Sequence, residues 1–318
     1  MPISGCLFKI FLLRVFIISG LVFLPAGTSS SGSVMVKDHH IKSFDGRTIY
    51  VKEKYTVDEN KSAGVVVCFA PCIHSHEFFD CPVSDYSLMD FLARKGFRVF
   101  AYDRRGFGFS YHPPDGKITY EVMLRDAESV VKFVLTESRV KTVSMVAFGF
   151  GAQIACCHAV RHPEQVDALA LMDFVWKVLP VPKPHLPQPD NKEMLLSQPN
   201  GYMKLSSVAD FFGWTLRFTT PEIRAWVKGT FTEAPVGPLL TADSLPLIKS
   251  VEKMHASILI IRGTRADITT QADSFDFLTK ISSQIRAMDA LEGAGPIPSL
   301  EREFYQTVFK DIAWFFSR

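Results

Sequence analysis

The loop at residues 71–82 holds the side chains of this 318-residue sequence that are best suited to acid–base or nucleophilic chemistry. His74 and His76 are separated by one residue, and Cys72 lies two positions before His74. A histidine near its ordinary pKa transfers protons at neutral pH, and a cysteine becomes a nucleophile where its surroundings lower its pKa. The other interpretation is a solvated loop, because the sequence shows no partner that would lower the pKa of Cys72.

Two carboxylates extend this set of candidate groups. Asp173 ends one apolar run, and Asp267 lies five residues after another. A carboxylate can donate or accept a proton, or orient a neighbouring histidine. The alternative for Asp173 is a turn residue that leads into the next segment, and for Asp267 a cap on the following helix.

A strand, a tight turn and a helix are predicted over residues 142–155. The apolar run at 143–148 stops at Gly149, and a helical pattern continues from Gly151. The motif G-x-S-x-G places a nucleophilic serine on a strained turn of this kind. Here the frame reads Ala147-Phe148-Gly149-Phe150-Gly151, so the turn is present and Gly149 stands where the serine would be.

The elements around these residues alternate between apolar runs and amphipathic segments. Extended runs occur at residues 64–70, 98–102, 143–148, 166–172, 257–262 and 286–291, and helical patterns at 88–95, 120–135, 272–281 and 300–316. Runs of this kind are buried on both faces of a sheet. The sequence therefore predicts an α/β fold with a mostly parallel central sheet and helices on both faces. A hairpin, residues 40–44 and 48–55 around Asp45-Gly46, precedes it.

One long insert interrupts the alternation, at about residues 174–250. It contains a proline-rich stretch and several helix-like segments with aromatic residues, among them Phe218 and Trp226. Its size suits a helical cap over the mouth of the sheet, with some of these aromatic residues facing a pocket. The folded domain is expected to span residues 35–318.

Together these segments resemble the α/β-hydrolase family, in its lipase- and esterase-like branch with a cap. Four stretches carry the resemblance: the turn at residues 102–110, the elbow at 148–151, the acid turn at 263–267 and the approach to the histidine at 291–295. The resemblance covers residue 41 to the C-terminus. It implies an α/β-hydrolase fold with a serine, a histidine and an acid as its triad.

The triad positions that the resemblance implies are mostly substituted. Gly149 has no side chain with which to attack, and Pro296 stands where the histidine belongs and accepts no proton. The His-Gly pair that begins the oxyanion loop is replaced by Ala70-Pro71, and proline has no N–H to donate. Only Asp267 remains, so the resemblance argues against serine-type hydrolysis.

Composition excludes several classes of function. The net charge of +2 and the lack of a basic run give no reason to expect nucleic acid binding. No C-x-x-C pair is matched by a second Cys or His pair, so a zinc site is not expected. No other cofactor is expected either. Cys72 and Cys81 lie in one loop, and an oxidising compartment would allow them to form a disulfide.

The N-terminal residues 1–28 have the pattern of a secretory signal peptide. Lys9 and Arg14 precede an apolar run at 15–24, and Pro25-Ala26-Gly27 follows it. The alternative is a short membrane anchor, which would associate the protein with a membrane through this segment. Export to a periplasmic, lumenal or extracellular space is the prediction.

Three hypotheses for function remain. The first is a non-catalytic protein that binds a small apolar ligand, or a protein partner, in a pocket lined by Cys72, His74 and residues 148–150. The second is a lyase, cyclase or isomerase that uses His74, His76 and Asp173. The third is an ester hydrolase that works through unusual residues. Whether the two histidines point into the pocket separates the first hypothesis from the second.

Overall fold

The computed structural model describes residues 33–57, 63–71, 73–174, 196–205, 216–238, 248–266 and 270–318. They contain an eight-stranded sheet whose strands lie in the order β1-β2-β4-β3-β5-β6-β9-β10. The strands are β1 Val34–Lys42, β2 Thr48–Thr56, β3 Gly64–Phe69, β4 Phe97–Tyr102, β5 Val143–Phe148, β6 Val166–Met172, β9 Ser257–Gly263 and β10 Arg286–Leu291.

The sheet is parallel from β4 to β10 and antiparallel at its β1–β2 end. β2 pairs antiparallel with both β1 and β4, and every pair from β4 through β10 is parallel. β3 and β5 are buried over most of their length, as expected of strands covered on both faces. The predicted fold class is confirmed. The first strand of the hairpin is longer than expected, because pairing with β2 extends back to Val34.

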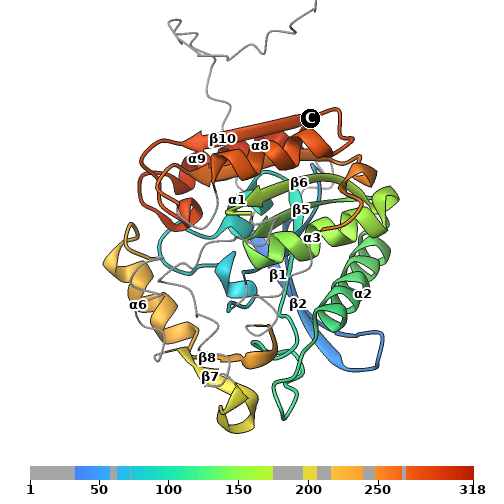
Figure 1. The fold of residues 1–318 in the computed structure, drawn as a ribbon, viewed down its shortest axis with the longest axis vertical. Coiled ribbons are helices and arrows are strands. Elements are labelled where there is room, and N and C mark those ends of the chain that lie inside the picture. Colours follow the sequence, from blue (N-terminus) through green and yellow to red (C-terminus); the bar gives the residue numbers. More distant parts are fainter. Residues whose placement is uncertain are drawn as a thin grey trace, which may run out of the picture. The chain divides into compact units, whose positions relative to one another are not determined.

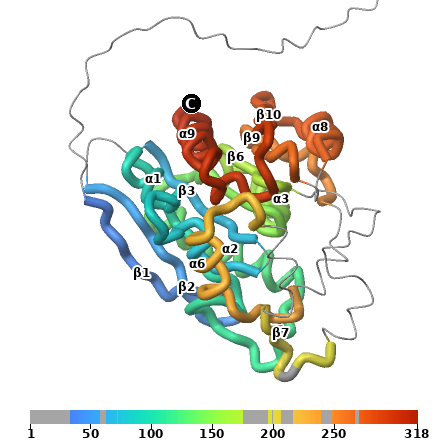
Figure 2. Tube along the Cα trace, turned by 90° about the vertical axis from the view of Figure 1, so that its left-hand side faces the viewer, coloured from blue at the N-terminus to red at the C-terminus, as the bar shows by residue number. Residues whose placement is uncertain are grey.

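Helices cover both faces of the sheet (Figure 1). The α-helices are α1 Leu88–Arg94, α2 Tyr120–Ser138, α3 Phe150–Arg161, α6 Pro221–Thr230, α8 Gln271–Lys280 and α9 Tyr305–Phe316, and the short 3-10 helices are η1 His76–Phe78, η2 Pro163–Gln165, η3 Pro199–Gly201, η5 Val251–Lys253 and η6 Pro298–Leu300. Residues of α1 and α9 belong to one buried core, and residues of α2, α3 and α8 to the other. Figure 2 shows α9 and α8 on opposite sides of the strands.

Local sequence explains why the longer helices begin where they do. Thr119 caps α2 by accepting a hydrogen bond from the N–H of Val122, and Thr270 and Asp273 form a capping box at the start of α8. The side chains of α2 from Leu124 to Val134 that were expected to face the core are buried. An apolar stripe at helical spacing therefore packs α2 against the sheet.

The described parts of the insert include the helix α6 and a small sheet. The helix is α6, and the sheet pairs β7 Tyr202–Lys204 with β8 Glu233–Pro235. The paired strands were not expected from sequence, because three-residue strands carry too little alternation to be seen. Much of the predicted cap and the whole of residues 1–28 lie outside the described residues. Among the described residues, no helix is long and apolar enough to span a membrane.

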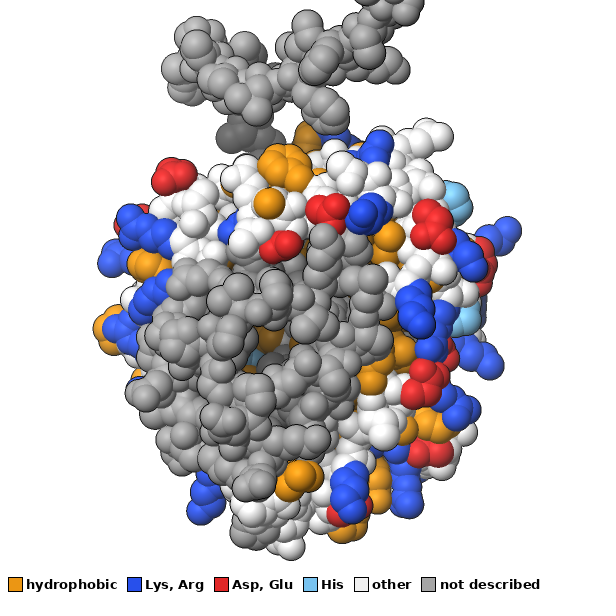
Figure 3. Space-filling view, viewed as in Figure 1, with side chains coloured by type: hydrophobic (Ala, Val, Ile, Leu, Met, Phe, Trp, Pro, Cys, Tyr) orange, Lys and Arg blue, Asp and Glu red, His pale blue; other side chains and the backbone are white. Residues whose placement is uncertain are grey.

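The surface carries charges of both signs. On the face drawn in Figure 3, described Lys and Arg side chains lie interspersed with Asp and Glu. This mixing agrees with the small net charge of +2.

Candidate functional site

The elbow is formed as the sequence predicts. β5 ends at Phe148, α3 begins at Phe150, and Gly149 between them has φ +51° and ψ −115°. Glycine tolerates such angles, whereas a residue with a β-carbon is strained there. Gly149 also offers no side chain to cap α3. The turn between β5 and α3 therefore carries no side chain at Gly149.

The two glycines of the elbow serve different purposes. A β-carbon on Gly151 would lie 2.3 Å from the carbonyl oxygen of Phe69 and 2.4 Å from that of Ala70, so only glycine allows α3 to approach the end of β3. A β-carbon on Gly149 would meet only the Cβ of Pro71, at 4.0 Å, among the described atoms. Space exists at Gly149, and the backbone angle is what disfavours a side chain there.

A row of rings leads from the elbow to the cap. Ring centroids are 5.1 Å apart between Phe148 and Phe78, 5.1 Å between Phe78 and His74, 4.4 Å between His74 and Phe231, and 5.6 Å between Phe231 and Trp226. These rings come from β5, the loop after β3 and the cap. Phe148, Phe78 and Phe231 belong to one buried core, so the row is packed inside the protein and begins at the residue before Gly149. Phe150, expected beside them, instead belongs to the core on the opposite face of the sheet.

His74 is buried within this row. Its side chain is 6% exposed, and its Nδ1 has no hydrogen-bond partner among the described residues. Burial, together with the nearby Arg104 charge, lowers the pKa of His74 to about 3. The imidazole is therefore neutral at physiological pH, with one nitrogen able to donate and the other to accept a hydrogen bond.

His76 has a different environment, although it is only two residues away. Its backbone N–H donates to Oδ1 of Asp103 over 2.8 Å, and its Nδ1 lies 2.7 Å from the same oxygen. The other oxygen of Asp103 accepts from the N–H of Phe109. His76 also packs on Tyr50 of β2, outside the ring row. The structure thus ties His76 to the turn after β4, and the two histidines do not form a pair.

Arg104 holds the loop after β3 in place. Its guanidinium donates to the carbonyl oxygens of Ala70, Pro71 and His74. It also lies 5.4 Å from the ring centroid of Phe150. The sequence did not indicate these partners, because the three carbonyl groups lie at least 30 residues before Arg104 in the chain.

The loop after β10, where the resemblance implies a histidine, is held by a buried carboxylate. Glu301, 2% exposed, accepts from the N–H of Gly295 over 2.8 Å and from that of Ile297 over 3.2 Å. Pro296 between them is buried. Burial raises the pKa of Glu301, which opposes its ionisation. No motif in the sequence indicated this clamp.

The acid turn and the histidine loop lie together, as the resemblance implies. Thr264 donates its N–H to the carbonyl of Leu291, and Arg265 donates to that of Ala294. Asp267 itself lies outside the described residues. Asp173 follows β6 with φ +44° and is buried. Burial lowers the pKa of the neighbouring Arg262, and the negative charge of Asp173 partly opposes that shift.

The cysteines give no support to a disulfide or a thiolate. Cys81 is a free, buried thiol. This contradicts the disulfide that was expected between Cys72 and Cys81. Burial raises the pKa of Cys81 to about 11, which keeps it protonated at neutral pH. Cys72 lies outside the described residues.

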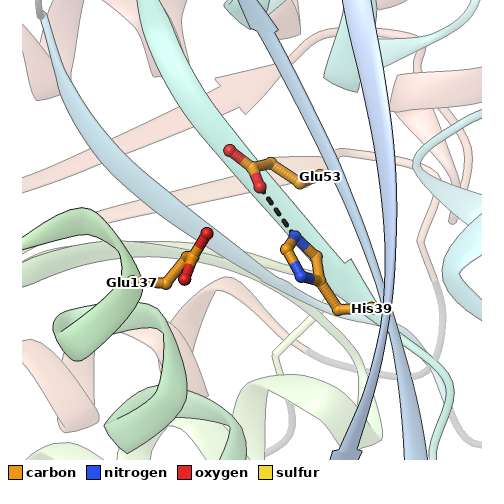
Figure 4. Close-up of side chains that lie close together, drawn as sticks. All are labelled: His39, Glu53 and Glu137. Carbon is orange, nitrogen blue, oxygen red and sulfur yellow. Dashed lines mark hydrogen bonds and ion pairs between the residues drawn. The ribbon is translucent and has the colours of Figure 1, made fainter.

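One cluster has residue types that can ligate a metal ion. Ligand atoms of His39, Glu53 and Glu137 lie within 4.8 Å of one another (Figure 4). Arg98 pairs with both carboxylates, and Lys37 lies 2.8 Å from Oε1 of Glu137. Two positive charges thus already balance two negative ones. The arrangement acts as an ion-pair network that joins β1, β2, β4 and α2.

A separate groove of about 970 Å³ lies between the cap and the C-terminal part of the chain. Phe218, Arg265, Gly293, Glu301 and the stacked pair Tyr86 and Tyr305 are among its lining residues. Residues 148–150 do not line it. The groove therefore neighbours the histidine loop but is distinct from the elbow.

Parts of this chain are similar in sequence to known hydrolases. Residues 73–227 match the profile of the family described as alpha/beta hydrolase fold. A 2-hydroxymuconate semialdehyde hydrolase from Pseudomonas sp. (strain CF600) is 34% identical over 87 residues, which are 27% of this chain and 29% of that protein. A proline iminopeptidase from Thermoplasma volcanium is 28% identical over 123 residues, 39% of this chain and 38% of the relative. The matched stretches thus span well under half of these relatives.

Solved structures match over a larger part of the chain. A hydrolase from Pseudomonas aeruginosa PA01 superposes with a TM-score of 0.68 at 16% identity, covering 88% of this chain and 98% of that one. An esterase from Exiguobacterium antarcticum superposes with a TM-score of 0.68 at 19% identity, covering 88% and 99%. At such identities the likeness concerns the fold alone.

Proposed function

We propose that this protein, which has the α/β-hydrolase fold, is a non-catalytic member that binds a small apolar molecule beside the elbow. The observation that carries the proposal is Gly149, a residue without a side chain at the N-terminus of α3. Serine-type hydrolysis requires a nucleophile and a base that takes its proton. Gly149 supplies no nucleophile, and Pro296 supplies no base.

The row of rings supports an apolar ligand. Phe148, Phe78, His74, Phe231 and Trp226 connect the elbow to the cap through aromatic contacts. Small-molecule sites are lined mainly by such side chains, with a few polar groups that orient the ligand. The neutral His74 is the polar group available in this row, so a ligand with one hydroxyl or carbonyl group on an apolar body fits best.

A non-hydrolytic enzyme is the second candidate function. The favouring observation is the buried Nδ1 of His74, which has no hydrogen-bond partner among the described residues. A neutral imidazole can accept a proton in a lyase or isomerase reaction, although its pKa of about 3 makes His74 a weak base near neutral pH. His76 lends no support to this candidate, because Asp103 holds it elsewhere. Hydrolysis through Cys72 would be a third route.

We further propose that the protein is exported and that residues 1–28 direct it, either as a cleaved signal or as an anchor. The basis is the charged and apolar pattern of that segment alone. A protein partner remains the alternative to a small ligand.

The test is to identify what the protein binds. Protein purified without detergent is extracted with organic solvent, and the extract is analysed by mass spectrometry. Displacement of the fluorescent probe 1-anilinonaphthalene-8-sulfonate then measures binding of any molecule found. We expect a stoichiometric apolar compound whose binding weakens at least tenfold in Phe231→Ala and is unchanged in Phe275→Ala, an exposed phenylalanine of α8. Turnover of that compound by the wild type, lost in His74→Phe, would instead favour the enzyme.

A further inference from the structure

β10 is the outermost strand at the parallel end of the sheet. It pairs with β9 alone, whereas each other parallel strand has a neighbour on both sides. The C=O groups of Ile285 and Leu291 accept hydrogen bonds from the side of β9. Successive residues of a strand point their backbone N–H and C=O groups to opposite sides. The groups that point away from β9 are therefore those of Arg286, Met288 and Ala290, and no described strand pairs with them.

Exposed apolar side chains flank this unpaired strand. Figure 2 shows β10 between α9 and α8. Burial and the charge of Asp289 raise the pKa of Asp311 in α9, so the two carboxyl groups are neighbours. Trp314 follows Asp311 by three residues, lies on the same face of α9 and is 59% exposed. Ile285, at the start of β10, is 46% exposed. An exposed, apolar strand edge of this kind is a template for pairing with another chain.

The strand at the other edge of the sheet is better protected against such pairing. β1 contains Lys37, Asp38 and Lys42, and charged residues, lysine above all, discourage a further strand from adding to an edge. β10 contains Arg286 and Asp289 and no lysine. The two edges thus differ, and β10 is the edge open to a further strand.

The faces of β10 limit how it can pair with a second copy of itself. Ala287 and Leu291 pack against the core that contains α9, and Met288 packs against the core that contains α8. Residues directly opposite each other in an antiparallel pair point to the same face. Two copies related by a two-fold axis must therefore pair about a residue, and not about the bond between two residues.

An axis at Met288 matches the side chains and the backbone. Ile285 then lies opposite Leu291 of the second copy, so an apolar residue meets an apolar residue. Arg286 lies opposite Ala290 of the second copy, and Met288 lies opposite itself. The outward N–H and C=O groups of these three even-numbered residues exchange hydrogen bonds across the pair, as in an ordinary antiparallel ladder.

Charges also match across this pairing. Arg286 and Glu292 are exposed and lie at opposite ends of β10. With the axis at Met288, Glu292 of the second copy is the diagonal neighbour of Arg286, within reach of long side chains. The same axis sets Asp289 opposite Ala287. An axis at Asp289 would instead place two copies of that carboxylate directly opposite each other, which is destabilising.

We propose that two copies of this chain pair antiparallel through β10, with the two-fold axis at Met288, and so form one continuous sheet. Such an interface uses the same patch on both copies, which is the commonest arrangement of homodimers. β6 and β9 lie between β10 and the elbow strand β5, so the pairing leaves the elbow untouched. The proposal is therefore independent of the proposed ligand.

Sedimentation equilibrium of the full chain over a wide range of concentration is the first test. We expect a dimer, and we expect Ala290→Pro to be monomeric, because proline removes an outward N–H and is tolerated on the open side of an edge strand. Ala290→Val keeps that N–H and should remain dimeric. Circular dichroism should show the same fold in all three proteins. A wild type that is monomeric throughout would overturn the proposal, as would assembly of any size that persists in Ala290→Pro.

Charge reversal then tests the register. Arg286→Glu and Glu292→Arg should each weaken the dimer at least about tenfold, since each places like charges on diagonal neighbours. The two changes combined should restore nearly the wild-type dissociation constant, which a merely structural role of either residue would not do. Arg302→Glu, an exposed residue of the groove, is the control and should dimerise like the wild type. A combined variant no tighter than the single variants would refute the axis at Met288.

Discussion

Pro71 faces Gly149 across the elbow, and its Cβ lies 4.0 Å from where a β-carbon on Gly149 would stand. This is ordinary van der Waals contact, so the site has room for a side chain. The backbone at φ +51° is what makes one costly. A side chain at position 149 is therefore disfavoured by backbone strain rather than by crowding.

Gly149→Ser should lower the free energy of unfolding by about 1–3 kcal/mol, because a β-carbon strains the backbone at this φ. Urea denaturation followed by circular dichroism measures the change. Gly229→Ala, in α6 with no heavy atom within 4 Å of the new β-carbon, is the control and should be neutral or stabilising. A fully stable Gly149→Ser protein would show that the elbow is not strained.

The wild type should not react with a fluorophosphonate probe or hydrolyse p-nitrophenyl butyrate above background. Gly149→Ser should remain unreactive as well, since no histidine takes the proton of the new hydroxyl. Adding Pro296→His supplies a base, and we expect at most weak labelling of that double variant, because each missing oxyanion donor lowers the rate about 10²–10³-fold. Robust ester turnover by the wild type would contradict the proposed function.

His74 should make the protein less stable as the pH falls. Its pKa of about 3 in the folded state lies below the ordinary value of 6.5, so between these values the unfolded chain binds the proton more readily. The stabilisation that comes from neutral His74 is present in full above pH 6.5. It is lost as the pH falls toward 3, at about 1.4 kcal/mol per pH unit.

Thermal unfolding of His74→Phe across this pH range tests the contribution. The variant should lose less stability in acid than the wild type does, whereas His112→Phe, a partly exposed histidine, should follow the wild type. Burial also lowers the pKa of His158 to about 3, so some acid sensitivity should persist. Identical pH profiles for His74→Phe and the wild type would place His74 in solvent.

Arg105→Leu should destabilise the protein by about 3–5 kcal/mol, because it leaves the buried carboxylate of Asp126 without its cation. Arg105 lies 2.7 Å from Oδ1 of Asp126 and also pairs with Asp45. Burial raises the pKa of Asp126 despite this partner, so the carboxylate depends on Arg105 to stay ionised. Chemical denaturation measures the loss.

Two further variants serve as comparisons for Arg105→Leu. Arg105→Leu with Asp126→Leu removes both charges and should recover much of the stability. Lys117→Leu breaks the exposed pair with Asp115 and should change little. If Arg105→Leu were as mild as Lys117→Leu, the turn after β4 would not depend on this ion pair.

Local sequence patterns were enough to predict the sheet, most of its helices and the elbow. Runs such as residues 64–69 are apolar throughout, and the stripe of α2 repeats at helical spacing, so burial can be read from neighbouring positions. The identities of Gly149 and Pro296 needed no coordinates, since a missing side chain and a missing proton acceptor are properties of the residues themselves.

The environments of the other candidate residues depend on contacts that form only in the folded protein. His74 and His76 are alike in sequence, yet one packs against Phe231 and the other pairs with Asp103, because their partners come from distant segments. Glu301 is an ordinary acid until the chain folds and presents it with two backbone N–H groups. Local patterns record burial and backbone preference, whereas contacts between distant residues depend on how the chain folds.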